Sequence, residues 1–324
     1  MKKVILSALL FVAGATFAQE SKLSISGSVD VYGTLNTVDG AGTPGLLIAN
    51  PANANGFGLG MANTVFAYEG SKSGVVADIA FGPRADDANM AGAINQLYAY
   101  YNVNDKVTVT AGQFNTFLGY EVISPAANFN YSVSYLFNAG PFSHTGIKLD
   151  YAASEDLSFL LAVTNGHGIS SADGNVTGDT QIGGQIGYKG QFLNVIYGHD
   201  GGVDDAMYLD YTGGFNASES FFVGINAAYV NSEKLDGGYS GIALYLENTF
   251  SDTFALGLRP ELFSVSAGDE DASVMALSLT ASTQLDDNLK LITEFRYDSS
   301  DDAMIEAINE ESVSAFTIAA VYSF

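Results

Sequence analysis

Apolar and polar residues alternate along most of the chain, in short segments that recur as far as the last residue. The final segment, SAFTIAAVYSF at 314–324, places its large apolar residues at every second position. Because successive side chains of a β-strand point to opposite faces, each segment predicts a strand with one apolar face. About 16 such segments occur, each near the roughly 10 residues that a tilted strand needs to cross a bilayer, and 14 or 18 strands also fit the pattern. No segment shows a convincing helical period.

The connections between the predicted strands alternate between long and short. The long ones lie near residues 37–59, 82–92, 117–143, 165–178, 200–205, 231–239, 264–271 and 298–311, and the short ones include NVND, ASED and LDDN. A soluble β-sandwich has no reason to place all its long loops on one side, whereas a transmembrane barrel has short periplasmic turns and longer outer loops. The pattern therefore predicts an all-β fold, a transmembrane antiparallel up-and-down β-barrel.

Aromatic residues flank several of the short connections. The flanking pairs are Tyr188 and Phe192, Phe215 and Phe221, and Phe250 and Phe254, and the terminal Tyr322 and Phe324 are expected at the same level. Transmembrane barrels carry such a girdle at the membrane interface, while a soluble sandwich with ordinary core aromatics is the alternative. Because an open sheet edge is not tolerated in hydrocarbon, we expect the last strand to pair with the first.

The first residues have the pattern of a secretory signal peptide. Lys2 and Lys3 precede a short apolar run, which is followed by small residues ending at Ala18. The run is too short to span a bilayer as a helix, although an uncleaved anchor is the alternative. We therefore expect a signal peptide over 1–18 and a single transmembrane β-barrel domain over 19–324.

Charge and composition exclude several classes of protein. A formal net charge of −24 argues against binding to nucleic acid. The chain has no cysteine, so disulfides do not hold it, and its apolar content argues against disorder. Acidic outer segments such as HDGGVDDA lack the spacing of a calcium-binding EF-hand loop. We expect no metal or cofactor, and we interpret these segments as solvated loops, bridged to lipopolysaccharide by loosely held divalent ions.

One stretch carries a family resemblance. Residues 111–146, AGQFNTFLGYEVISPAANFNYSVSYLFNAGPFSHTG, resemble the β-barrel porin-2 family of Gram-negative outer membranes, and FGPRADDANM and VTNG fit the same pattern. The resemblance implies a pore-forming barrel in the bacterial outer membrane, without a defined substrate. Its similarity to outer-membrane barrels also implies that Tyr322 and Phe324 belong to a signal read by the barrel-assembly machinery. General porins are often trimers, but no sequence feature fixes a homotrimer here.

The long connection at 117–143 is the least polar of the outer connections and carries one acid, Glu121. A loop with so many aromatic residues is not expected to remain in water. We expect it to fold into the lumen, as the third loop of general porins does. The residues expected to line a mostly neutral constriction are Asn128, Asn130, Tyr131, Ser132 and Tyr135. The alternative is a loop that caps the mouth or packs between subunits.

The alternation of side chains between the two faces of each strand also predicts which charged side chains face the lumen. They include Lys148, Asp150, Arg259, Glu261, Lys290, Glu294 and Arg296, together with Asp30, Asp78, Asp210 and Glu247. Lys148 with Asp150, Arg259 with Glu261, and Glu294 with Arg296 are each two residues apart, hence on one face of a strand. Such rows create a transverse field that sorts ions, or they are ion pairs that only stiffen the wall. The surplus of inward acids favours a weak preference for cations.

Taken together, these patterns predict an outer-membrane porin. A barrel of about 16 strands is too wide for its side chains to fill, which leaves a water-filled channel for passive diffusion of small hydrophilic solutes and ions. One alternative is an adhesin or structural barrel that acts through its acidic loops. A second is a barrel hydrolase, for which His199 beside Asp200 and Asp205 is the candidate base, without a recognisable serine motif.

Overall fold

The computed structural model describes residues 22–37, 55–88, 92–166, 179–200, 204–232, 237–268, 270–300 and 311–324. The expected signal peptide, residues 1–18, lies outside them. The strands are β1 (Lys22–Asn36), β2 (Gly56–Glu69), β3 (Ser73–Phe81), β4 (Ile94–Asn104), β5 (Val107–Asn115), β6 (Ser143–Ala152), β7 (Leu157–Thr164), β8 (Gln181–Tyr188), β9 (Gln191–Asp200), β10 (Asp204–Asn216), β11 (Phe221–Ser232), β12 (Gly237–Ser251), β13 (Phe254–Ala267), β14 (Glu270–Gln284), β15 (Leu289–Ser299) and β16 (Ser312–Ser323).

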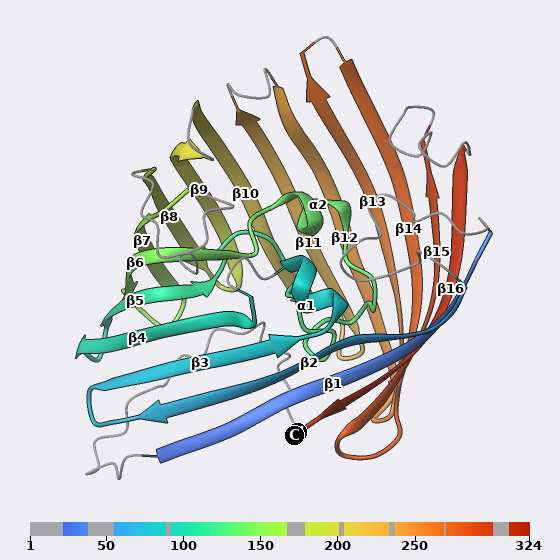
Figure 1. Cartoon of the computed structure of the whole chain (residues 1–324), viewed down its shortest axis with the longest axis horizontal. Coiled ribbons are helices and arrows are strands. Elements are labelled where there is room, and N and C mark those ends of the chain that lie inside the picture. The colour runs from blue at the N-terminus through green and yellow to red at the C-terminus, as the bar shows by residue number, and fades with distance from the viewer. Residues whose placement is uncertain are drawn as a thin grey trace.

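These strands form one closed antiparallel barrel in which each strand pairs with its neighbours in sequence (Figure 1). The last strand, β16, pairs with β1 in a register that runs from Ser28 opposite Ser323 to Asn36 opposite Ala315. Beyond the last ladder pair, Phe324 and Gly27 exchange two backbone hydrogen bonds, each of 3.0 Å. The predicted pairing of the first and last strands is therefore confirmed.

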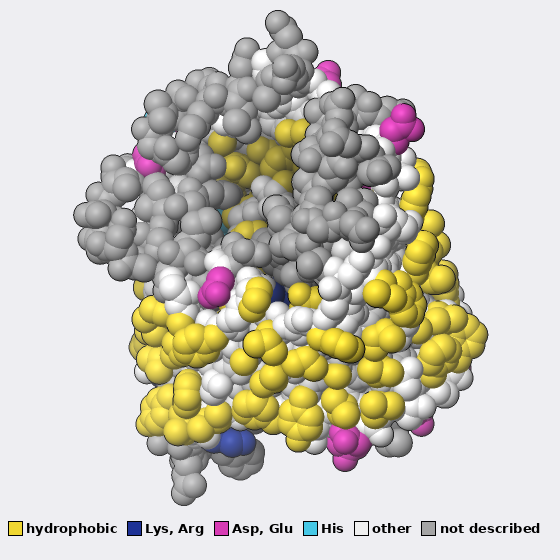
Figure 2. All heavy atoms as spheres, turned by 45° about the vertical axis from the view of Figure 1, so that its right-hand side comes forward, with side chains coloured by type: hydrophobic (Ala, Val, Ile, Leu, Met, Phe, Trp, Pro, Cys, Tyr) yellow, Lys and Arg dark blue, Asp and Glu magenta, His cyan; other side chains and the backbone are white. Residues whose placement is uncertain are grey.

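The two faces of the barrel wall differ in polarity in the predicted way. On β1, Leu23, Ile25, Val29 and Val31 are exposed on the outside, while Ser28 and Asp30 on the alternate face are buried inside the barrel. Hydrophobic side chains form a broad band around the outside of the wall (Figure 2). A water-soluble protein buries such surface, so this band is suited to contact lipid chains.

Aromatic side chains lie on the outer face beside the short connections. Those exposed there are Tyr188, Phe215, Phe250, Phe254, Tyr322 and Phe324, and Phe192 and Phe221 are partly exposed. The rings of Phe250 and Phe254 pack with their centroids 6.0 Å apart. This arrangement agrees with the predicted girdle at one membrane interface.

Not every connection expected to be long is long. Only residues 201–203 separate β9 from β10, and only residues 268–269 separate β13 from β14. The strands β12, β13 and β14 have 15, 14 and 15 residues, more than the roughly 10 that a bilayer requires. Strand pairing therefore continues past the apolar band, through residues such as Ser264 and Ser266, and takes up chain that the sequence predicts as loop.

Two short helices lie inside the ring of strands, where the sequence predicts no helix (Figure 1). They are α1 (Pro83–Ala88) and α2 (Tyr135–Ala139), of six and five residues, which is too short to show a hydrophobic period. Ser134 caps α2, and its Oγ accepts a 3.0 Å hydrogen bond from the backbone N–H of Phe137. Within the described part of the chain, neither helix has the length and apolar character needed to cross a membrane.

Candidate functional site in the lumen

The connection between β5 and β6, residues 116–142, folds into the barrel as predicted (Figure 1). We refer to it as the third loop. Its backbone and side chains contact the wall from β8 to β15 and at β1, so it crosses the lumen from one side to the other. An inward loop has many backbone N–H and C=O groups that no strand ladder satisfies, and these groups need partners.

Two wall carboxylates supply acceptors for this backbone. Glu294 on β15 accepts hydrogen bonds from the backbone N–H groups of Tyr131 and Ser132, both at 3.0 Å. Glu261 on β13 accepts from the N–H groups of Tyr135 and Leu136, at 3.0 and 2.9 Å. In each carboxylate, both oxygens accept one hydrogen bond, and the two donors are the backbone N–H groups of consecutive loop residues. Charge-assisted bonds of this kind are stronger than neutral ones, so they fix the position of the loop.

Two arginines bind the same segment from the wall. Arg259 forms an ion pair with Glu121 of the loop at 2.5 Å and donates to the carbonyl oxygen of Ser132 at 2.6 Å. Arg296 donates to the carbonyl oxygen of Val133 at 2.6 Å and to Asp298 at 2.8 Å. Both guanidinium groups are almost fully buried. Buried charges persist only when they are paired and hydrogen-bonded, so the wall and the loop stabilise each other.

A third arginine, Arg84 on α1, holds the loop from the opposite side. Its guanidinium lies over the ring of Tyr131, 4.5 Å from the centroid, and donates to the Tyr131 carbonyl oxygen at 3.0 Å. The Tyr131 hydroxyl donates to Asp30 on β1 at 2.6 Å. Burial raises the pKa of the Tyr131 phenol, which keeps the donating proton in place. This contact could not be predicted from the sequence, because α1, with six residues, is too short for a hydrophobic period that would orient Arg84.

Glycines in the wall make room for large side chains of the loop. A Cβ atom added at Gly183, Gly224 or Gly257 would lie 2.5, 2.7 or 2.2 Å from an atom of Phe117, Tyr120 or Phe129, respectively. Each of these glycines is in a different strand, β8, β11 or β13. The loop therefore packs into notches in the wall, which the sequence shows only as glycines within predicted strands.

The structure brings the five predicted constriction residues together within the loop. Asn130, Tyr131, Ser132 and Tyr135 are buried, and Asn128 is partly exposed. The Asn130 amide donates to Thr280 of β14 at 2.6 Å, and the Asn128 amide bonds to both the N–H and the C=O of Val122. These contacts hold the loop in its fold and against the wall, and a role for the five residues in narrowing the pore stays a prediction.

All seven predicted lumen charges lie on the inward face, and the loop covers four of them, Arg259, Glu261, Glu294 and Arg296. Lys148 and Asp150 form the expected ion pair, at 2.7 Å, and remain partly exposed. Arg259 does not pair with Glu261, nor Arg296 with Glu294, because those carboxylates bind loop amides. Lys290 donates to the carbonyl oxygens of Pro125, Ala126 and Asn128, at 3.3–3.4 Å.

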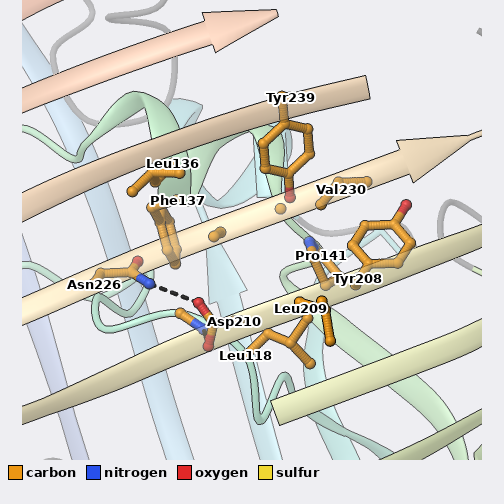
Figure 3. A pocket seen from close by; sticks show the side chains of 13 residues that line it. Leu118, Leu136, Phe137, Pro141, Tyr208, Leu209, Asp210, Asn226, Val230 and Tyr239 are labelled. Carbon is orange, nitrogen blue, oxygen red and sulfur yellow. Dashed lines mark hydrogen bonds between the residues drawn. The ribbon is translucent and has the colours of Figure 1, made fainter. Parts of the chain in front are cut away.

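Between the third loop and strands β10–β12 lies a small cavity of about 20 Å³ (Figure 3). Leu118, Leu136, Phe137, Pro141, Tyr208 and Tyr239 contribute most of its apolar lining. At its edge, Asp210 accepts from Asn226 at 2.6 Å and from the N–H of Gly119 at 3.0 Å. The cavity has room for about one water molecule, so the third loop packs closely against this part of the wall.

The candidate base of the alternative barrel hydrolase, His199, lies in the part of the chain that the structure describes. His199 lies 3.2 Å from Asp205, and Asp205 also accepts from the Tyr197 hydroxyl at 2.5 Å. Tyr197 and His199 are exposed, unlike the buried lumen charges. Among the described residues, no group of three or more His, Asp or Glu side chains is placed to hold a metal ion.

The closed barrel, the apolar outer band and the inward loop define an outer-membrane β-barrel of the porin type. A family model described as "Putative beta-barrel porin-2, OmpL-like" matches residues 22–324, and the chain belongs to this family. The family resemblance found at 111–146 is therefore confirmed over nearly the whole chain. The family and its fold place the protein in the bacterial outer membrane.

Solved structures of other outer-membrane proteins share the fold at low sequence identity. OprB of Pseudomonas putida is 8% identical, with a TM-score of 0.61 and coverage of 94% of each chain. The trimer form of OmpT of Vibrio cholerae is 11% identical, with a TM-score of 0.59 and coverage of 94% of this chain and 100% of OmpT. OprD of Pseudomonas aeruginosa is 9% identical, with a TM-score of 0.51 and coverage of 93% and 95%. No curated protein matches the chain.

Proposed function

We propose that the barrel is a passive channel for small hydrophilic solutes and ions across the outer membrane. The observation that carries the proposal is that the third loop occupies only part of the lumen. On β4 and β6, the inward side chains of Tyr98, Tyr100, Lys148 and Asp150 remain partly exposed. A barrel of this strand number is too wide for wall side chains alone to fill, so water occupies the remaining space.

The third loop sets the size limit of this channel. Asn128, Asn130, Tyr131, Ser132 and Tyr135 contribute to the constriction chiefly by holding the loop in place, as their hydrogen bonds indicate. A rigid loop gives a defined cross-section, whereas a mobile loop would give a fluctuating one. The inward acids outnumber the inward bases among the described residues, which supports a weak preference for cations.

The proposal also includes the partners and processing of the protein. Residues 1–18 are removed as a signal peptide, and the barrel-assembly machinery reads Tyr322 and Phe324, whose rings are exposed at the end of β16. OmpT of Vibrio cholerae has a trimer form, which supports a homotrimer here. Lipopolysaccharide surrounds the outer loops. An enzymatic role is not proposed, because the family is one of porins.

Reconstitution into a planar bilayer tests the function directly. We expect stepwise current increments whose size grows with salt concentration, and swelling of liposomes in small sugars without any energy source. A folded barrel that inserts into the bilayer without producing current would contradict the proposal and favour an adhesive or structural role.

A further inference from the structure

Two tyrosines of β4, Tyr98 and Tyr100, have hydroxyl groups that are open to the lumen. Both side chains lie on the inward face and are partly exposed, whereas the neighbouring Tyr101 is on the lipid-facing side. In the part of the chain that the structure describes, neither hydroxyl has a hydrogen-bond partner, and neither is closed off from solvent. The buried Tyr131 of the third loop differs, because its hydroxyl donates to Asp30. The two β4 hydroxyls are therefore available to water or to a solute.

The ring of Tyr100 lies over the backbone of Gly74, its direct partner on β3. A Cβ atom added at Gly74 would be 2.5 Å from the Cζ atom of the ring and 2.6 Å from Cε1, so the ring occupies the space of the missing side chain. One face of the ring is thus held against the wall, and the other is turned to the lumen. That face is apolar, while the hydroxyl at its edge is polar.

The ion pair of Lys148 and Asp150 on β6 also has hydrogen-bonding capacity to spare. The Lys148 ammonium donates to Oδ2 of Asp150 at 2.7 Å. Among the described residues, no other group bonds to the ammonium or to the second oxygen of the carboxylate. The two side chains are 19% and 23% exposed. The pair carries no net charge, yet it offers both donors and an acceptor to a solute.

Only small inward side chains separate the tyrosines from this ion pair. Thr110 on β5 pairs with Tyr100 on one side and with Lys148 on the other. Adjacent strands are about 4.8 Å apart, so the backbones of Tyr100 and Lys148 are about 10 Å apart. Asp150 is close enough to Tyr98 to act on it electrostatically. A solute the size of a monosaccharide that lies over Thr110 can therefore contact the tyrosines and the ion pair together.

These residues lie between the third loop and the short connections. Tyr100 is four residues from the last residue of β4, and Asp150 is two residues from the last residue of β6. The third loop contacts β6 near the opposite end, where Thr116 and His144 are joined by a 2.9 Å hydrogen bond. A solute that has passed the loop meets the tyrosines and the ion pair before it leaves the barrel.

We propose that Tyr98, Tyr100, Lys148 and Asp150 form a subsite for uncharged polyhydroxylated solutes such as monosaccharides. The free face of the Tyr100 ring contacts the C–H groups of the sugar, and the polar groups exchange hydrogen bonds with its hydroxyls. A zwitterion such as an amino acid fits less well, because binding at both of its charges would separate Lys148 from Asp150. The inference rests on the proposed channel function and names the class of solute that the channel favours.

Block of the ion current by D-glucose tests the subsite in planar bilayers. A bound sugar reduces the single-channel current in a saturable way, beyond the effect of viscosity. We expect Tyr100→Ala to raise the glucose concentration for half-block about two- to tenfold, because the stacking face is lost. Tyr100→Phe keeps the ring and should stay close to the wild type. Tyr101→Ala removes the adjacent ring on the lipid-facing side and is the matched control.

A second variant removes only a hydroxyl. Tyr98→Phe keeps the ring and its packing, so its folding is not at risk. We expect it to raise the glucose concentration for half-block about two- to tenfold, the effect of one lost hydrogen bond. Without glucose, the current of this variant should equal that of the wild type.

The possible results distinguish the subsite from the channel. Wild-type current that falls with glucose only as viscosity requires would overturn the subsite and leave the channel function standing. An equal loss of block in Tyr101→Ala, or unchanged block in Tyr100→Ala and Tyr98→Phe, would also overturn it. Saturable block by glycine but not by glucose would overturn the choice of solute class. A wild-type barrel that inserts without current would overturn the channel function, and the subsite with it.

Discussion

The ring of Phe324 covers the backbone of Gly27, at the point where the two residues also exchange backbone hydrogen bonds. A Cβ atom at Gly27 would lie 2.8 Å from the Cζ atom of Phe324 and 2.2 Å from the backbone oxygen of Asn63 on β2. The close approach of three strands at this point therefore requires glycine. The last residue of the chain is held both by the ladder and by this contact.

The variant Gly27→Ala is expected to displace the Phe324 ring and shift the pairing of β1 with β2. Overpacking of this kind costs about 1–3 kcal/mol, so the barrel should unfold at a lower temperature. The mobility of the protein on a detergent gel after stepwise heating measures the midpoint temperature of barrel unfolding. Ile25→Ala, two residues away on the same outer face, serves as the control. An unchanged midpoint in Gly27→Ala would show that the ring has another place to pack.

Replacing Glu261 by glutamine should release part of the third loop. Glutamine presents one acceptor oxygen and one NH₂ group to the two N–H donors of Tyr135 and Leu136, so one donor loses its partner. Loss of such a buried bond costs about 1–3 kcal/mol. We expect larger or fluctuating single-channel currents. Glu219→Gln, at an exposed turn, should record the wild-type current. A steady wild-type current in Glu261→Gln would mean that the hydrogen bonds from Tyr135 and Leu136 to Glu261 do not control the pore.

The wall notch at Gly257 provides a test that alters no charge. Gly257→Ala places a methyl group where the Phe129 ring now lies, so the ring and the adjoining loop must move. Single-channel conductance is expected to change, and a protease should gain access to the loop near Phe129. Gly184→Ala is the matched control, since the nearest atom to its added Cβ is 3.7 Å away. Equal behaviour of the two variants would argue against the packing described for Phe129.

Arg84→Met should loosen the loop from the α1 side. The change removes the cation–π contact with Tyr131 and the hydrogen bond to its carbonyl oxygen while keeping much of the side-chain volume. A buried carbonyl oxygen without its donor costs about 1–3 kcal/mol. We expect a lower midpoint of heat unfolding on detergent gels, and Arg84→Lys should restore only part of it because lysine cannot stack in the same way. Lys72→Met, at an exposed turn, is the control. A wild-type midpoint in Arg84→Met would show that α1 does not stabilise the loop.

The barrel itself could be predicted from the sequence because period-two alternation is a local property. Residues such as Ile25, Val29 and Val31 report their face of the strand without knowledge of any distant contact. The inward course of the third loop was also readable, because its aromatic residues have no other place from which water is excluded. The strand alternation and the apolar character of the loop both follow from whether a side chain faces lipid or water, so both can be seen in the sequence.

The contacts within the lumen could not be predicted in the same way. The two-residue alternation along β13 places Arg259 and Glu261 on one face. It does not show that Glu121 of the loop approaches Arg259 or that Glu261 accepts hydrogen bonds from two backbone amides. Those partners are set by the path of a loop without regular structure. The contacts of Arg84 and of Gly257 depend on the same path, so they too became visible only in three dimensions.

Tyr131 gives the loop a role beyond the pore. Its N–H binds Glu294 of β15 and its hydroxyl binds Asp30 of β1, so one residue spans β16 and joins the strands on either side of it. The join between the beginning and the end of the chain thus has an internal brace. Separation of β16 from β1 or β15 therefore has to break the hydrogen bonds of Tyr131 to Asp30 or Glu294 as well. These two hydrogen bonds can form only after β15, β16 and β1 have assembled. Barrel completion and loop docking are consequently expected to be a single cooperative event.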